Sequence, residues 1–224
     1  MEKWCPFYIF VQLKTITMPN WCSNSIVIEG DVDKIKKIKR VLQSRDTTNT
    51  NTGVFQTLVG RDENLSEAQF QNGAWYEHNI DRFGCKWDVD YDESNIDVDS
   101  DDCITMSPQT AWSPPEGFCR LLSEQYGVRV TLEYSEPGCD FAGKLIIHPD
   151  GQEESEQYEY LEGLYFIDED LFWMEVRNNL EYEFDEEPRD VEEWLKDFEF
   201  VSMNHKSELV DLYNEVKEEY QESN

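Results

Sequence analysis

Strand-like and helix-like patterns of apolar residues alternate along the first two thirds of the chain. Residues 25–29 (SIVIE) form a β-branched run that ends at Gly30, which is typical of a strand. From Asp31 to Ser44 the apolar residues recur at helical spacing, so we predict an amphipathic helix over this range. The apolar residues of this helix are Val32, Ile35, Ile38, Val41 and Leu42.

Strict alternation of apolar and acidic residues marks the segment 87–101. With a turn at 93–95, this pattern predicts an antiparallel hairpin that has one apolar and one acidic face. Its aspartates are Asp88, Asp90, Asp92, Asp97, Asp99 and Asp101, and the apolar residues between them are Trp87, Val89, Tyr91, Ile96 and Val98. The preceding residues 45–82 are polar and weakly periodic, and we expect them to be an insertion containing a loop at TTNTNTG.

The remaining patterns complete an α+β fold. Pro114 and Pro115 open a predicted helix that runs to about Tyr126 and stops at Gly127. Strands are expected over 128–136 and 143–148, and helices over 171–180, 191–198 and 209–220. The order strand, helix, strand, strand, helix, strand is that of a ferredoxin-like split βαβ sandwich with an antiparallel sheet, here followed by an acidic, mainly helical extension.

We therefore expect three parts in the chain. Residues 18–150 form the ferredoxin-like core domain, and residues 151–224 form the acidic, mostly helical C-terminal region. Residues 1–17 form an N-terminal extension or an extra strand, because Met18 offers a second start. The apolar run 4–13 is too short to span a bilayer and lacks the features of a signal peptide.

Charge is the strongest compositional signal. The 224 residues include 49 acidic and 19 basic side chains, which gives a formal net charge of −30. Two blocks hold most of it: residues 81–102 carry −7 and residues 150–224 carry −21. Solubility needs a net charge of only roughly 2 to 8. Such a field repels nucleic acid and anionic membranes and attracts basic partners.

Catalytic motifs are missing from the sequence. There are three histidines and no G-x-S-x-G, P-loop, H-E-x-x-H or C-x-x-C pattern, so we expect neither an enzyme nor a cofactor. Six cysteines without paired spacing fit reduced thiols in the cytoplasm. The basic helix face around Lys34–Arg40 could indicate an RNA-binding ferredoxin-like domain. The aromatic, glycine-bearing strand that such domains use to bind RNA is missing from the sequence, which argues against this function.

Four short motifs occur in order: MPNWCSNSIVIEG (18–30), WYEHNIDRFGCKWD (75–88), TAWSPPEGF (110–118) and YSEPGCDFAG (134–143). Together they resemble the YubB-like family of phage and plasmid proteins, which has a ferredoxin-like domain. The resemblance covers roughly residues 18–150. It implies the fold and a mobile-element origin, and it implies no activity. The acidic region after about residue 150 exceeds the pattern of that family.

The acidic hairpin allows three interpretations: a solvated face, a calcium site, or a surface that mimics nucleic-acid phosphates. The D-x-D-x-D start at Asp88 fits a calcium loop, but Glu93 stands where glycine is needed and Asp99 where glutamate is needed. Alternate strand residues lie about 6.6 Å apart, which gives a regular row of charges.

The hypothesis we carry forward is an inhibitor that binds a basic host protein or nucleoprotein complex of a defence system by mimicking nucleic-acid charge. Besides the hairpin aspartates, its expected partner-binding residues are Glu186, Glu187, Glu192, Glu193, Trp173 and Trp194. The alternative is an interaction module that uses an aromatic surface, with acidity serving only solubility. Its candidate residues, which could equally be structural, are Trp21, Trp75, Trp87, Trp112, Gly84, Pro114, Gly138 and Gly143.

Overall fold

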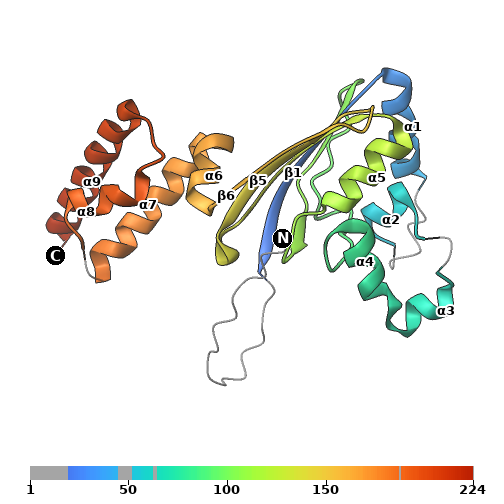
Figure 1. Ribbon diagram of the computed structural model, residues 1–224, viewed down its shortest axis with the longest axis horizontal. Coiled ribbons are helices and arrows are strands. Elements are labelled where there is room, and N and C mark those ends of the chain that lie inside the picture. The colour runs from blue at the N-terminus through green and yellow to red at the C-terminus, as the bar shows by residue number, and fades with distance from the viewer. Residues whose placement is uncertain (1–19, 45–51, 63–64, 187, 224) are drawn as a thin grey trace. The chain divides into compact units, whose positions relative to one another are not determined.

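The computed structural model describes residues 20–44, 52–62, 65–186 and 188–223 (Figure 1). The chain divides into two compact units. The first runs to Asp140 and also includes Lys144–Glu156, and the second combines Phe141–Gly143 with the residues from Gln157 onward.

Among the residues that the structure describes, one antiparallel sheet of six strands organises the fold. The strands are β1 (Trp21–Glu29), β2 (Cys103–Met106), β3 (Gln109–Ala111), β4 (Arg129–Glu136), β5 (Phe141–Ile147) and β6 (Glu153–Tyr158). Their order is β2-β1-β4-β5-β6, and β3 pairs with β1 on the same side as β2. In this register Ile26 lies opposite both Met106 and Leu132, and Trp21 lies opposite Ala111. β2 and β3 therefore form one edge of the sheet.

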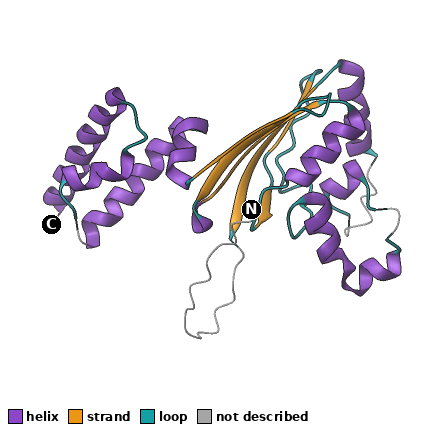
Figure 2. Cartoon of the chain, viewed as in Figure 1, coloured by secondary structure: helices purple, strands orange, loops and turns teal. Residues whose placement is uncertain are grey.

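The helices of the first unit gather on one side of the sheet (Figure 2). They are α1 (Val32–Gln43), α2 (Val54–Val59), α3 (Glu67–Gln69), α4 (Trp75–Phe83) and α5 (Glu116–Tyr126), with a π-helical turn over Phe70–Ala74. Their apolar faces and alternate strand residues form a core that includes Ile26, Ile28, Ile35, Ile38, Phe55, Phe83, Phe118, Leu122, Val130 and Leu132. The α+β class, the antiparallel sheet and the predicted helices at α1 and α5 are confirmed.

The insertion predicted over 45–82 contains α2, α3 and most of α4 in its described part, and most of the predicted loop TTNTNTG (47–53) lies outside the described residues. One prediction for the first unit is wrong. The segment 87–101 does not pair with itself as a hairpin; it runs as turns and bends, with one isolated bridge between Asp97 and Thr105. The strands expected there lie further along, at β2 and β3. The segment departs from the strand pattern because Ser94 is fully buried in a turn and Asp88 is turned toward α2.

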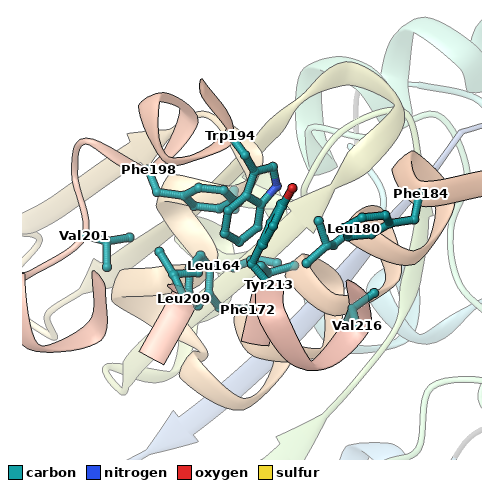
Figure 3. Close-up of a cluster of buried hydrophobic side chains, with 12 residues drawn as sticks. Leu164, Phe172, Leu180, Phe184, Trp194, Phe198, Val201, Leu209, Tyr213 and Val216 are labelled. Carbon is teal, nitrogen blue, oxygen red and sulfur yellow. The ribbon is translucent and has the colours of Figure 1, made fainter. Parts of the chain in front are cut away.

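The second unit is helical. It contains α6 (Tyr160–Ile167), α7 (Glu169–Glu186), α8 (Val191–Trp194) with a 3-10 turn over Leu195–Phe198, and α9 (Met203–Ser223). Its core includes Leu164, Phe172, Val176, Leu180, Phe184, Trp194, Phe198, Val201, Leu209, Tyr213 and Val216, together with Ala142 of β5 (Figure 3). The helical character predicted for this region is confirmed, whereas α6 and the exposed strand β6 were not foreseen.

Candidate binding surfaces

The acidic segment 88–102 is an ordered loop along the β2/β3 edge of the sheet. Lys39 of α1 donates to the backbone carbonyls of Val98 and Ser100. The backbone N–H of Ser107 donates to the carbonyl of Ser94 at 2.8 Å. These bonds fix both halves of the loop against the first unit, so its exposed carboxylates have defined positions.

Asp88 does not belong to that acidic surface. One carboxylate oxygen accepts the backbone N–H groups of Phe55 and Val89, both at 2.8 Å, and the other accepts that of Gln56 at 3.0 Å. Burial raises the pKa of Asp88, and these hydrogen bonds partly offset the rise. The prediction that Asp88 binds a partner is therefore corrected: the side chain satisfies the start of α2.

The other aspartates predicted in this segment are exposed. They are Asp90, Asp92, Asp97, Asp99 and Asp101. Asp97 also holds the loop, because its Oδ1 accepts the backbone N–H of Asp99 at 2.9 Å. The structure therefore presents these carboxylates irregularly, in place of the evenly spaced row expected of a strand.

A cavity of about 540 Å³ opens beside this loop. The indole rings of Trp21 and Trp87 lie in its wall with their centroids 6.0 Å apart. Asp90, Glu93 and the buried Ala111 also line it. Aromatic and acidic residues that the sequence suggested separately are thus brought together in one place.

The other residues of the aromatic motifs have mixed placements. Trp112 is 44% exposed and has a φ of 74°, which is rare for a non-glycine residue. Its backbone N–H donates to the backbone carbonyl of Asn20 at 3.0 Å. Trp75 is half-buried in α4. Gly84 ends α4 in the left-handed conformation, and a Cβ there would lie 3.2 Å from the carbonyl oxygen of Pro114, so the structure favours glycine at this position.

Two more of these glycines lie in close-packed places. A Cβ on Gly138 would come within 2.5 Å of the side-chain amide of Asn20, and Gly143 is buried in β5. Neither residue lines the cavity between Trp21 and Trp87. Their positions fit the structural interpretation of these motifs.

The second unit presents an acidic stripe on α9. Six carboxylates, all but one adjacent pair separated by three or four residues, fall within an arc of roughly 100° of the helix surface. They are Glu208, Asp211, Glu215, Glu218, Glu219 and Glu222, and all six are exposed. The lysines of this helix, Lys206 and Lys217, fall outside the arc. This α9 stripe was not singled out from the sequence, although its spacing is visible there.

Two arginines neutralise part of the acidity of this unit. Arg177 of α7 bridges to α9 through Glu215 at 2.9 Å and Glu219 at 2.8 Å. The guanidinium of Arg189 donates two hydrogen bonds, of 2.8 and 2.9 Å, to the carboxylate of Glu183, and this interaction lowers the pKa of Glu183. Glu208, Asp211, Glu218 and Glu222 form no ion pair with the residues that the structure describes.

The two tryptophans predicted as partner-binding anchors, Trp173 and Trp194, differ in how deeply they are buried. Trp194 is only 3% exposed and packs against Phe198 and Tyr213, so its predicted role as a surface anchor is corrected: it fills the core. Trp173 is half-buried and lies against Phe172 and His205.

The acidic residues predicted beside these anchors are mostly at the surface. Glu186 is exposed at the end of α7, and Glu192 and Glu193 are exposed in the first turn of α8. Glu187 lies outside the described residues. The predicted residues of 88–101 and of 173–194 belong to different units.

Three buried cysteines and His78 are held in structural settings. Burial raises the pKa of Cys22 to about 12 and raises the pKa of Cys85 and Cys119 as well, so these thiols stay protonated near neutral pH. The ring of His78 accepts the N–H of Asp62 at 3.2 Å and packs against Phe83. Over the described ranges, no group of three or more His, Cys, Asp or Glu residues could hold a metal ion.

Comparison with known proteins supports the fold. Residues 86–170 match the family model of the ferredoxin-like domain in Api92-like protein, which confirms the ferredoxin-like class predicted from the sequence. The crystal structure of a protein api92 from Yersinia pseudotuberculosis is similar at a TM-score of 0.45 and 9% identity, over 63% of this chain and 98% of that chain. The search of curated proteins found no match. Among the described helices, none is long and apolar enough to cross a membrane.

Proposed function

We propose that the protein acts by binding, not catalysis, and that its acidic surface occupies the nucleic-acid-binding groove of a basic host protein. In this proposal the protein is a phage or plasmid product, similar to YubB-like proteins, that works in the host cytoplasm against a defence complex. The observation that carries the proposal is the stripe of exposed carboxylates along α9.

The spacing of the α9 stripe suits this role. Its six carboxylates span Glu208 to Glu222, which corresponds to about 21 Å of helix at a rise of about 1.5 Å per residue. The six carboxylates enclose five intervals, so their mean spacing along the axis is about 4.2 Å. This is of the same order as the ~3.4 Å of axis per charge along one DNA strand. A site that reads phosphates through Lys and Arg would meet a similar charge density.

Preorganisation further supports the proposal. α9 is packed on the aromatic core through Leu209, Tyr213 and Val216, which are all buried. The bridge from Arg177 to Glu215 and Glu219 ties α9 to α7 and leaves four carboxylates of the stripe without an ion pair among the described residues. Charges held on a folded helix lose less conformational entropy on binding than charges on a disordered tail.

The test compares two full-length variants that each lose four negative charges. One removes the unpaired carboxylates of the α9 stripe, and the matched control removes exposed carboxylates of the first unit. The α9 variant is E208Q/D211N/E218Q/E222Q, and the control is D33N/E77Q/D81N/E124Q. Each protein is immobilised and exposed to the heparin-retained fraction of a bacterial extract.

Wild type and the control should retain the same nucleic-acid-binding proteins and release them to duplex DNA or to raised salt. The α9 variant should bind them roughly tenfold more weakly, because the complementary charges are lost. If all three retain the same proteins with the same salt dependence, the α9 stripe is not a binding surface. The acidity would then serve solubility, as in the alternative based on an aromatic surface.

A further inference from the structure

The cavity beside Trp21 and Trp87 has walls of two chemical kinds. The lining residues include Trp21, which is 45% exposed, and Trp87, together with the acidic residues Asp90 and Glu93. Its volume of about 540 Å³ falls within the roughly 300–1,000 Å³ usual for ligand sites. Rings beside carboxylates are suited to an organic cation, because a cation is attracted both to the ring face and to the negative charge.

The turn that carries the two carboxylates is fixed in place. Ser94 is fully buried, and its hydroxyl donates to the backbone carbonyl of Asp90. At the other end of the turn the N–H of Val54 donates to the carbonyl of Val89 at 2.9 Å. The side chains of Asp90 and Glu93 therefore project from a rigid support, and neither forms an ion pair with the residues that the structure describes.

The neighbouring residues also favour a cation. The carboxylate of Asp88 is bound by three backbone N–H groups, so it leaves Asp90 and Glu93 as the carboxylates available to a ligand in this cavity. Lys86 already places its Nζ 4.4 Å from the ring centroid of Trp87, which shows that this ring accepts a cation on one face. The surrounding residues 81–102 carry a net charge of −7 and would repel phosphate groups.

We propose that this cavity binds the side chain of an arginine from a partner protein. A guanidinium is planar, so it can stack on the exposed Trp21 ring while donating hydrogen bonds to Asp90 and Glu93. A metal ion is a poorer fit, since two carboxylates and two indoles do not supply a third ligand. This site lies in the first unit and does not depend on the α9 stripe, so it is a second, independent binding site.

The proposal is tested with the peptide Ac-Gly-Arg-Gly-NH₂ and the full-length protein carrying ¹⁵N-labelled tryptophan. Titration to millimolar concentration should shift the indole N–H signals of Trp21 and Trp87 in a saturable way. The same peptide with lysine should bind more weakly, and the peptide with uncharged citrulline should leave both signals unchanged. The variant D90N/E93Q should bind the arginine peptide roughly tenfold more weakly.

The control variant D99N/D101N removes the same number of charges from the same loop and should bind as wild type does. The α9 variant should also bind normally, which separates this proposal from the proposed function. The arginine site is overturned if citrulline binds as well as arginine, if the control weakens binding as much as D90N/E93Q, or if no saturable shift occurs. Equal binding of lysine would overturn the preference for arginine.

Discussion

The carboxyl group of Asp88 fills the space into which a side chain on Gly53 would project. A Cβ built on Gly53 would lie 2.4 Å from the carboxyl carbon of Asp88. The backbone of Gly53 has φ −80° and ψ −174°, which other residues adopt easily. The requirement for glycine is therefore one of space, and it is set by a residue 35 positions away in the sequence.

Gly53→Ala should destabilise the protein by about 2–6 kcal/mol. The new methyl group would push the Asp88 carboxylate away from the N–H groups of Phe55 and Gln56, and each of these two donors left without a partner costs about 1–3 kcal/mol. Urea unfolding of the full chain measures the change.

A double-mutant cycle with Asp88→Ala isolates the cause of that loss. In the Asp88→Ala background the clash is removed, so Gly53→Ala should cost almost nothing further. Additive costs would show that Gly53 is required for a reason other than the Asp88 carboxylate.

Trp194→Ala should cost about 3–5 kcal/mol in the stability of the helical unit, as is usual when a large aromatic side chain is removed from a core. The ring is buried and lies between Phe198 and Tyr213. Thermal unfolding followed by circular dichroism measures the loss.

Trp173→Ala provides the comparison, because this side chain is half-buried and should cost clearly less. Should the two substitutions cost the same, the packing described for Trp194 would be wrong. A Trp194→Ala variant with unchanged stability and lost partner binding would restore its role as a surface anchor.

Acid should weaken the helical unit through Glu183. Arg189 lowers the pKa of this carboxyl below its ordinary value of 4.5, so the folded state favours the charged form. The stabilisation is fully present above pH 4.5 and is lost as the pH falls through the lower pKa of the folded state. Glu183→Gln should lower the free energy of unfolding by about 1 kcal/mol at neutral pH. The stability of this variant should also fall less steeply as the pH is lowered.

Glu192→Gln is the control for this prediction, because Glu192 is exposed in the same unit. Protonation also relieves repulsion within a chain of net charge −30, so the informative quantity is the difference between the two variants. Parallel stability curves for the two variants from pH 7 to pH 3 would contradict the role of the ion pair.

Local sequence patterns were enough for elements that follow one periodicity and have clear ends. α1 was predicted over Asp31–Ser44 and forms Val32–Gln43, because its apolar residues recur at helical spacing on one face. α5 was found in the same way, with Gly127 ending it at a φ of 64°.

Sequence reasoning failed where distant residues decide the conformation. The alternation at 87–101 is real, but Asp88 points to α2 and Ser94 is buried, and neither fact has a local signal. Strand β6 has almost no buried residue, so no alternation could reveal it. The cavity combines Trp21 and Trp87, which only the folded chain brings together.

Ala142 is a strand residue that contributes to the core of the helical unit. It belongs to β5, yet it packs in the aromatic core of the helical unit, where a Cβ on Gly163 would come within 2.6 Å of its methyl group. The helical unit is thus a discontinuous domain. A transplant of residues 157–224 onto another protein would leave this piece of its interior behind.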